Sequence, residues 1–171
     1  MESITNQTYS NLEVIVVDDS STDHTQDVIR EHKKIDSRIV YLRNNASTGT
    51  PMGTRNVGIG VARGEYLAFL DDDDEWLPAK IEMQLQLISV YSMICCGCNI
   101  LTSSRVFRHS PTGNKEFDIE DIFRSARYFY PSGILAKVEH VKKIGGFDQV
   151  LPEWEFFIRM INNFGKAVVL A

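Results

Sequence analysis

The sequence is poor in positive charge and has no long apolar run. Its 18 lysines and arginines are outnumbered by 23 aspartates and glutamates, so the formal net charge is -5. This balance excludes a basic stripe for nucleic acid and a polybasic patch for anionic lipid. No apolar run approaches the length of a membrane span, and Met1–Asn11 lack the regions of a signal peptide. We therefore predict a soluble chain with no transmembrane segment and no nucleic-acid partner, in the cytoplasm or peripherally at the inner face of the membrane.

The chain also lacks the cysteine and histidine patterns of zinc, redox or triad sites. Its three cysteines, Cys95, Cys96 and Cys98, fall in an apolar run without a second ligand pair at zinc spacing. We interpret them as small buried residues. The four histidines match no metal or triad spacing, so we assign them no role.

What the chain does have is the composition and patterning of one α/β domain. With 43% apolar and 24% charged residues, a chain of 171 residues can bury a sizeable core. Apolar runs at 12–17 and 66–70 predict buried strands, and helical spacing follows each of them. We expect a single domain over 1–171, with a regular half at 1–88 and a more variable half at 89–171.

Local signals indicate where the helices and strands lie. Asp23 and Gln26 have capping-box spacing, ahead of a helix that is expected to bury Val28, Ile29 and Ile35. In the second half we predict strands at 94–101, 105–107 and 133–136, and helices at 118–125, 138–144 and 155–163.

The runs 12–17 and 66–70 both end abruptly in carboxylates. Asp18 and Asp19 follow the first, and five consecutive acids, Asp71–Glu75, follow the second. Like charges so close raise one another's pKa unless a cation separates them, and oxygen ligands suit Mg²⁺ or Mn²⁺. Because the carboxyl ends of parallel strands share one edge, we expect both acid sites to face one crevice. A solvated acidic turn is the alternative interpretation.

Several blocks of sequence occur in an order and spacing typical of one protein family. They are Asn6–Tyr9 with Leu12–Asp23, Arg55–Ile59, Ala62–Tyr66, Phe69–Trp76 and Gly145–Asp148. In these blocks the chain resembles glycosyltransferase family 2. The resemblance implies a GT-A fold, which is an open, mostly parallel sheet with helices on both faces. It also implies metal-dependent, inverting transfer of a sugar from a nucleoside-diphosphate sugar, most often a UDP-sugar, to a carbohydrate or lipid-linked acceptor in polysaccharide synthesis.

The resemblance further implies roles for the acids. Asp18 and Asp19 match the family's acids for the base and ribose, in keeping with the hydrogen bonds that carboxylates accept. A helix-entry cap is the alternative for this pair. The family's Asp-x-Asp element maps onto Asp71, Asp72 and Asp73. Asp73 is expected to bind the metal, Mn²⁺ or Mg²⁺, and Asp71 or Asp72 to lie nearer the ribose.

Two further positions match family motifs. Arg55 matches an Arg-Asn pair, and it either binds the diphosphate or only ties its loop to the acids. Glu153 matches the general base, just ahead of an aromatic residue and a helix start. The family more often has Asp there, and the segment between Asp148 and Glu153 is shorter than expected. The alternative for Glu153 is a surface residue that the helix macrodipole favours.

The beginning of the sequence departs from the family. Family members start with an apolar strand and a turn that walls the base, whereas this sequence starts inside the helix that follows. We therefore expect the first strand to be missing, with an unpaired sheet edge and a half-built base pocket. The chain is expected to be a fragment.

Two other functions stay open at this point. A non-catalytic relative would keep the fold as a binding module and lose the chemistry. A signalling receiver domain also opens with an apolar strand that ends in an acid pair, as at Asp18 and Asp19. A receiver, however, has a lone Asp after a later strand and no Arg-Asn-Val-Gly block, which this chain has at 55–58.

We interpret Trp76 and Trp154 as packing residues, with stacking on a sugar as the alternative.

Overall fold

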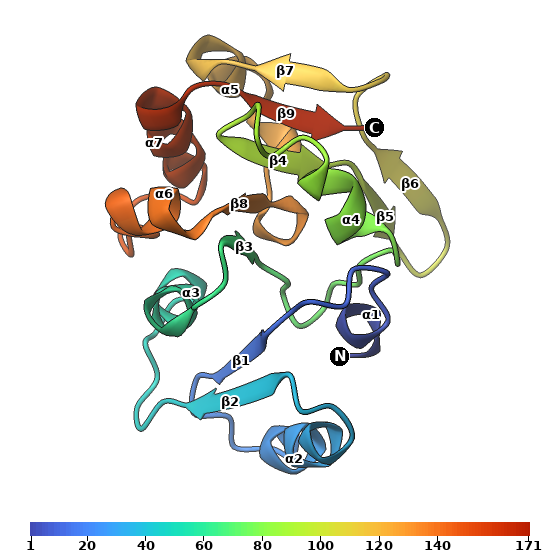
Figure 1. Ribbon diagram of the computed structural model, residues 1–171, viewed down its shortest axis with the longest axis vertical. Helices are drawn as coiled ribbons and strands as arrows, with labels where there is room; N and C mark the ends of the chain where they lie inside the picture. The colour runs from blue at the N-terminus through green and yellow to red at the C-terminus, as the bar shows by residue number, and fades with distance from the viewer.

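A small parallel sheet forms the N-terminal part of the computed structural model, which describes residues 1–171 apart from the side chains of residues 125 and 126 (Figure 1). Its strands are β1 (Val14–Asp18) and β2 (Ile39–Arg43). One face packs against α1 (Glu2–Thr5) and α2 (Thr25–Ile35). On the other face lies α3 (Pro51–Val61), which contacts β1. The predicted strand, acidic turn and helix are therefore present.

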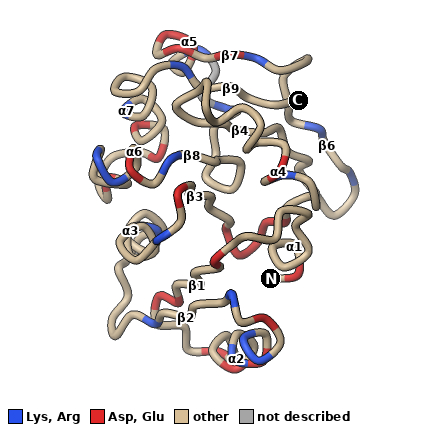
Figure 2. Tube along the Cα trace, in the orientation of Figure 1, with Lys and Arg blue, Asp and Glu red and all other residues tan. Residues whose placement is uncertain are grey.

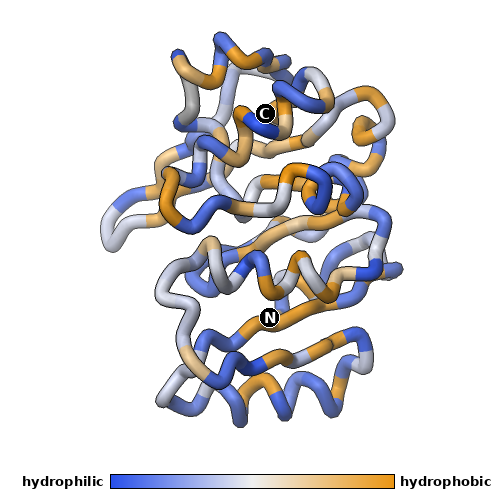
Figure 3. The backbone as a smooth tube through the Cα atoms, turned by 90° about the vertical axis from the view of Figure 1, so that its left-hand side faces the viewer, coloured by the Kyte–Doolittle hydropathy of each residue, from blue (hydrophilic) through white to orange (hydrophobic). Residues whose placement is uncertain are grey.

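The details predicted for α2 are partly wrong. Asp23 accepts hydrogen bonds from the backbone N–H and hydroxyl of Thr25, so a local turn replaces the capping box. Ile29 is buried as predicted, whereas Val28 is 52% exposed and Ile35 87% exposed. A two-stranded sheet covers only a narrow strip of the helix. In Figure 3, α2 runs along the bottom of the molecule and alternates apolar and polar segments, as a helix with one buried stripe does.

A five-stranded sheet forms the second part of the molecule. In spatial order its strands are β3 (Tyr66–Ala68), β8 (Leu135–Lys137), β4 (Met93–Cys96), β9 (Ala167–Leu170) and β7 (Lys115–Phe117). β8 runs antiparallel to both β3 and β4, and β7 runs antiparallel to β9. Only β4 and β9 pair in parallel, so this sheet is mixed and not mostly parallel as expected.

Helices cover both faces of this sheet, as predicted. Met93 and Cys95 of β4 point to an aromatic core beneath α5 (Ile119–Ser125), α6 (Val138–Lys143) and α7 (Trp154–Phe164). Ile94 points to the opposite face, which α4 (Lys80–Leu85) and Ile88 cover. Cys95 is fully buried, and burial raises the pKa of its thiol, so its interpretation as a small core residue is confirmed. Cys96 and Cys98 are only partly buried, so the same interpretation is wrong for them.

The predicted strand 94–101 is divided in two. Gly97 ends β4, and the chain continues in a separate hairpin of β5 (Cys98–Leu101) and β6 (Val106–His109). A side chain at position 97 would bring its Cβ within 2.2 Å of the Cβ of Ser110, so glycine is needed for this close approach. Two short 3₁₀ turns, η1 (Ala126–Tyr128) and η2 (Pro131–Gly133), lead into β8.

The two sheets stay separate. Among the described residues, β1 pairs only with β2 and β3 pairs only with β8, so the expected unpaired sheet edge is present. No helix in the described part of the chain combines the length and apolar character that a membrane crossing needs.

Candidate active site

Asp19 organises the loop that leads into α3. Its carboxylate accepts hydrogen bonds from the side chains of Asn44 and Ser47, both at 2.6 Å, and from the backbone N–H of Thr48 at 2.9 Å. The bonds from Ser47, Asn44 and Thr48 hold the pKa of Asp19 well below its usual value. Asp19 therefore positions residues 44–50 as a fixed, anionic turn.

Asp18 has a different environment, because its side chain has no exposed surface. It accepts hydrogen bonds from the hydroxyl of Tyr41, from Arg43 at 3.0 Å and from the backbone N–H of Ser21 at 2.7 Å. Burial would raise the pKa of Asp18, but these bonds outweigh it and hold the pKa below its usual value. Asp18 thus faces partners on β2, and neither Tyr41 nor Arg43 was identified from the sequence.

Arg55 connects Asp71, one of the predicted donor-side acids, with Glu153, the predicted general base. Its guanidinium donates to both carboxylate oxygens of Asp71, at 2.7 and 2.9 Å, and through its other terminal nitrogen to Glu153. The Arg55 side chain is only 11% exposed. Burial alone would lower the pKa of Arg55, yet hydrogen bonds from the two carboxylates raise it. Of the two roles left open for Arg55, the structure displays the tie to the acids.

The acid turn, which is the segment Asp71–Glu75, contacts η2. The backbone N–H of Asp71 donates to the Ser132 hydroxyl at 3.0 Å, and the indole N–H of Trp76 donates to the Ser132 carbonyl at 2.7 Å. Trp76 also lies over the buried ammonium of Lys80, 4.3 Å from the ring centre. These contacts agree with a packing role for Trp76, whereas Trp154 is half exposed beside Phe123.

The remaining acids of the turn project into solvent. Asp72, Asp73, Asp74 and Glu75 are exposed, and in the described part of the chain no three metal-ligating side chains converge on one point. Mg²⁺ commonly uses one or two carboxylates and completes its shell with water and substrate phosphates. The donor set therefore fits a cation shared with a bound phosphate, and it does not form an all-protein cage.

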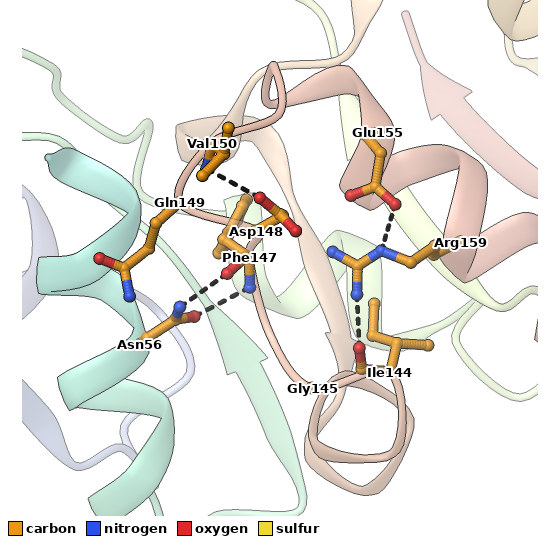
Figure 4. A pocket seen from close by; sticks show the side chains of 9 residues that line it. All are labelled: Asn56, Ile144, Gly145, Phe147, Asp148, Gln149, Val150, Glu155 and Arg159. Atoms are coloured by element: carbon orange, nitrogen blue, oxygen red, sulfur yellow. Dashed lines mark hydrogen bonds and ion pairs between the residues drawn. The ribbon is translucent and has the colours of Figure 1, made fainter.

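Glu153 immediately precedes α7, and its side chain is 38% exposed. The Gly-Gly-Phe-Asp block ahead of it is tied to α3 by Asn56, which donates to the Phe147 carbonyl at 2.7 Å and accepts from the Phe147 N–H at 2.8 Å. Asp148 then closes a turn by accepting the backbone N–H groups of the next residues (Figure 4). The short segment before Glu153 is thus held at both ends.

A polar cavity of about 560 Å³ opens beside this segment. Figure 4 shows Asn56 and Gln149 on one side of it and Glu155 and Arg159 on the other, with Asp148 between them. Arg159 is held by Glu155 and by the carbonyls of residues 144 and 146. The cavity offers hydrogen-bonding groups of the kind that sugar hydroxyls use.

The predicted site residues are thus brought together in part. Asp71, Arg55 and Glu153 form one contact group, although 98 positions separate Arg55 from Glu153. Asp19 joins them through Thr48, whose hydroxyl lies 3.0 Å from that of Thr54, the neighbour of Arg55. Sequence reasoning missed the partners of Asp19; the serine, threonine and asparagine content of 44–50 was the available signal.

Comparison of the sequence with known proteins identifies a family that matches most of this chain. The model of Glycosyl transferase family 2 matches residues 1–145. The chain is 47% identical over 88 residues to the Escherichia coli UDP-Glc:alpha-D-GlcNAc-diphosphoundecaprenol beta-1,3-glucosyltransferase WfaP, covering 52% of this chain and 34% of that protein. It is 30% identical over 171 residues to an uncharacterized glycosyltransferase of Haemophilus influenzae, covering 95% of this chain and 56% of that protein. The chain therefore spans between about a third and somewhat more than half of these relatives.

Solved structures show the same fold. The Staphylococcus aureus TarS 1–349 structure in complex with UDP-GlcNAc superposes with a TM-score of 0.83 at 20% identity, covering 99% of this chain and 50% of TarS. The Pyrobaculum calidifontis mannosyltransferase PcManGT, in complex with GDP-Man and Mn2+, superposes with a TM-score of 0.73 at 17% identity, covering 97% of this chain and 48% of that protein.

Proposed function

This chain belongs to glycosyltransferase family 2 and has the GT-A fold, and from this premise we propose that it transfers a sugar, with inversion, from a UDP-sugar to a hydroxyl of a lipid-linked acceptor. WfaP is named for a UDP-glucose donor and a diphosphoundecaprenol acceptor, and the donor and acceptor proposed here follow that relative. Family membership also removes the receiver-domain alternative.

The observation that carries the proposal is the Arg55 bridge. One guanidinium spans Asp71, on the proposed donor side, and Glu153, the proposed base. A donor on the acid turn and an acceptor at the start of α7 would therefore lie within reach of each other. Inverting transfer needs this arrangement, because the attacking hydroxyl and the leaving phosphate must occupy opposite faces of the sugar.

Glu153 is proposed to act as the general base. Arg55 holds its Oε1 and leaves Oε2 to take the proton from the acceptor hydroxyl. As that oxygen bonds to the anomeric carbon, the carbon's bond to the phosphate oxygen breaks, and the electron pair leaves with the nucleoside diphosphate. A hydroxyl is a weak nucleophile, so a carboxylate positioned for proton transfer contributes roughly 10² to 10⁴ in rate.

The donor-side residues have distinct proposed parts. Asp73 would hold Mn²⁺ or Mg²⁺, with Asp72 nearer the ribose, and such a cation neutralises charge on the departing diphosphate. Asp19, together with the loop that it organises, is proposed to bind the base and ribose of the donor. Asp18 was predicted to bind the base and ribose together with Asp19. Because its side chain has no exposed surface and bonds to Tyr41 and Arg43, we propose instead that it supports the end of β1 beside Asp19.

The test compares Glu153→Gln with a matched control, Glu139→Gln. Glu139 is likewise a glutamate at the start of a helix, in the first turn of α6, and its side chain is 75% exposed. Glu153→Gln is expected to keep the wild-type affinity for UDP with Mn²⁺ by calorimetry and to lose at least about a hundred-fold in transfer rate. Glu139→Gln is expected to leave both unchanged.

Transfer by Glu153→Gln at the wild-type rate would refute the assignment of the base. A protein that binds UDP but transfers no sugar from any of a panel of nucleotide-sugar donors would instead be the non-catalytic binding module.

A further inference from the structure

The hairpin of β5 and β6 exposes large apolar side chains on both of its faces. Ile100, Leu101, Val106 and Phe107 are between 48% and 75% exposed. Ile100 pairs with Phe107 and Leu101 with Val106. Because successive residues of a strand point to opposite faces, one apolar pair lies on each face. Four neighbouring apolar side chains on a projecting element differ from the single exposed ones that every surface has.

The charge of this segment is opposite to that of the whole chain. Residues 83–115 contain no aspartate or glutamate, although the chain as a whole has a net charge of -5. Arg105 and Arg108 are exposed on the hairpin. Figure 2 shows blue along β6. The whole-chain balance, which argued against an anionic lipid partner, therefore conceals a local segment that is both basic and apolar.

The hairpin leaves the same edge of the sheet as the acid turn. β3 and β4 both run antiparallel to β8, so they are parallel to each other. The acid turn follows β3, and the hairpin follows β4. The segment 130–132 links the two, since the Tyr130 hydroxyl bonds to the Cys96 carbonyl and Ser132 accepts from the Asp71 N–H. A flat surface that contacts the hairpin would lie on the side of the proposed donor site.

We propose that the β5–β6 hairpin docks on an anionic phospholipid membrane. Its four apolar side chains enter the boundary between headgroups and acyl chains, and Arg105 and Arg108 pair with lipid phosphates. The hairpin is apolar and basic and has no acid of its own, so it matches an anionic bilayer in both respects. The inference deepens the proposed function, on which it rests for its purpose, because a lipid-linked acceptor is presented at such a surface.

Co-sedimentation with vesicles tests the docking surface directly and needs no nucleotide sugar. The probes are vesicles of phosphatidylcholine mixed with phosphatidylglycerol, and vesicles of phosphatidylcholine alone. The wild-type protein is expected to bind the mixed vesicles and to lose binding as salt is raised. Arg105→Gln with Arg108→Gln is expected to lower the partition coefficient about 25-fold, at about five-fold for each arginine.

A second double variant, Leu101→Ser with Val106→Ser, removes the most exposed apolar pair and is expected to abolish binding to the mixed vesicles. Its matched control is Val28→Ser with Ile35→Ser, where two side chains of similar exposure lie on α2, the helix that packs on the β1–β2 sheet. The control is expected to bind like the wild type. Thermal melting of every variant checks that the fold is retained.

Three results would overturn the proposal: no vesicle binding by the wild type, equal loss in the α2 control, or a hairpin that binds a second copy of the chain. The last would appear in sedimentation velocity as a dimer that dissociates in the Leu101→Ser, Val106→Ser variant. Failure of the proposed function is distinguishable, since vesicle binding without transfer from any donor refutes only the reaction.

Discussion

Replacing Arg55 tests the centre of the proposed site. Arg55→Met keeps most of the apolar stem but leaves Asp71 and Glu153 without the cation between them. Hydrogen bonds to charged groups contribute roughly 1.5–3 kcal/mol each. The carboxylates are 35% and 38% exposed, so solvent screening removes about half of that. We expect a loss of about 2–3 kcal/mol in the free energy of unfolding, which for a chain of this size is a fall in Tm of roughly 5–10 °C.

The same variant separates the two roles that the sequence left open for Arg55. If Arg55 only positions Glu153, transfer by Arg55→Met is expected to show a kcat about a hundred-fold lower with an unchanged KM for the donor. If Arg55 also binds the diphosphate, KM for the donor rises as well. Arg55→Lys keeps a positive charge but cannot donate to two carboxylates in the fixed geometry of a guanidinium. The stability of this variant is therefore expected to lie between that of Arg55→Met and that of the wild type.

The control for this experiment is Arg63→Met. Arg63 is 78% exposed and pairs with a single carboxylate, that of Glu13. Its loss is expected to change the free energy of unfolding by less than about 0.5 kcal/mol. An Arg55→Met protein that melts like the wild type and retains kcat would refute the bridge as an organising contact.

Two further predictions concern the acid turn and the lysine beneath it. Asp73→Ala is expected to abolish the Mn²⁺-dependent part of UDP binding in calorimetry, and an equal loss in Asp74→Ala would show that no single acid holds the cation. Lys80 is buried, and burial lowers its pKa to about 8. Its charge therefore opposes folding at neutral pH, and stability rises between pH 8 and 10.5 as the folded protein loses a proton that the unfolded chain keeps. Lys80→Met should remove this rise in urea unfolding, whereas parallel pH curves for the two proteins would contradict the argument.

The positions of the elements were largely readable because they follow from local patterns. The run of β-branched residues before Asp18 became β1, and the glycine at position 165 ends α7 with a positive φ, as glycine allows. The same patterns failed where a neighbour distant in sequence intervened. In the strand predicted at 94–101, β4 ends just before Gly97, which Ser110 approaches closely. The narrow sheet beneath α2 leaves Ile35 exposed.

Sequence pattern was sufficient to place carboxylates at the ends of two strands and to indicate the family, because consecutive residues carry both signals. It did not reveal that Asp18 is enclosed by Tyr41 and Arg43, or that a single arginine connects Asp71 with Glu153. Those partners lie between 16 and 98 positions apart, so their contacts exist only once the packing of the helices and sheets has brought them together.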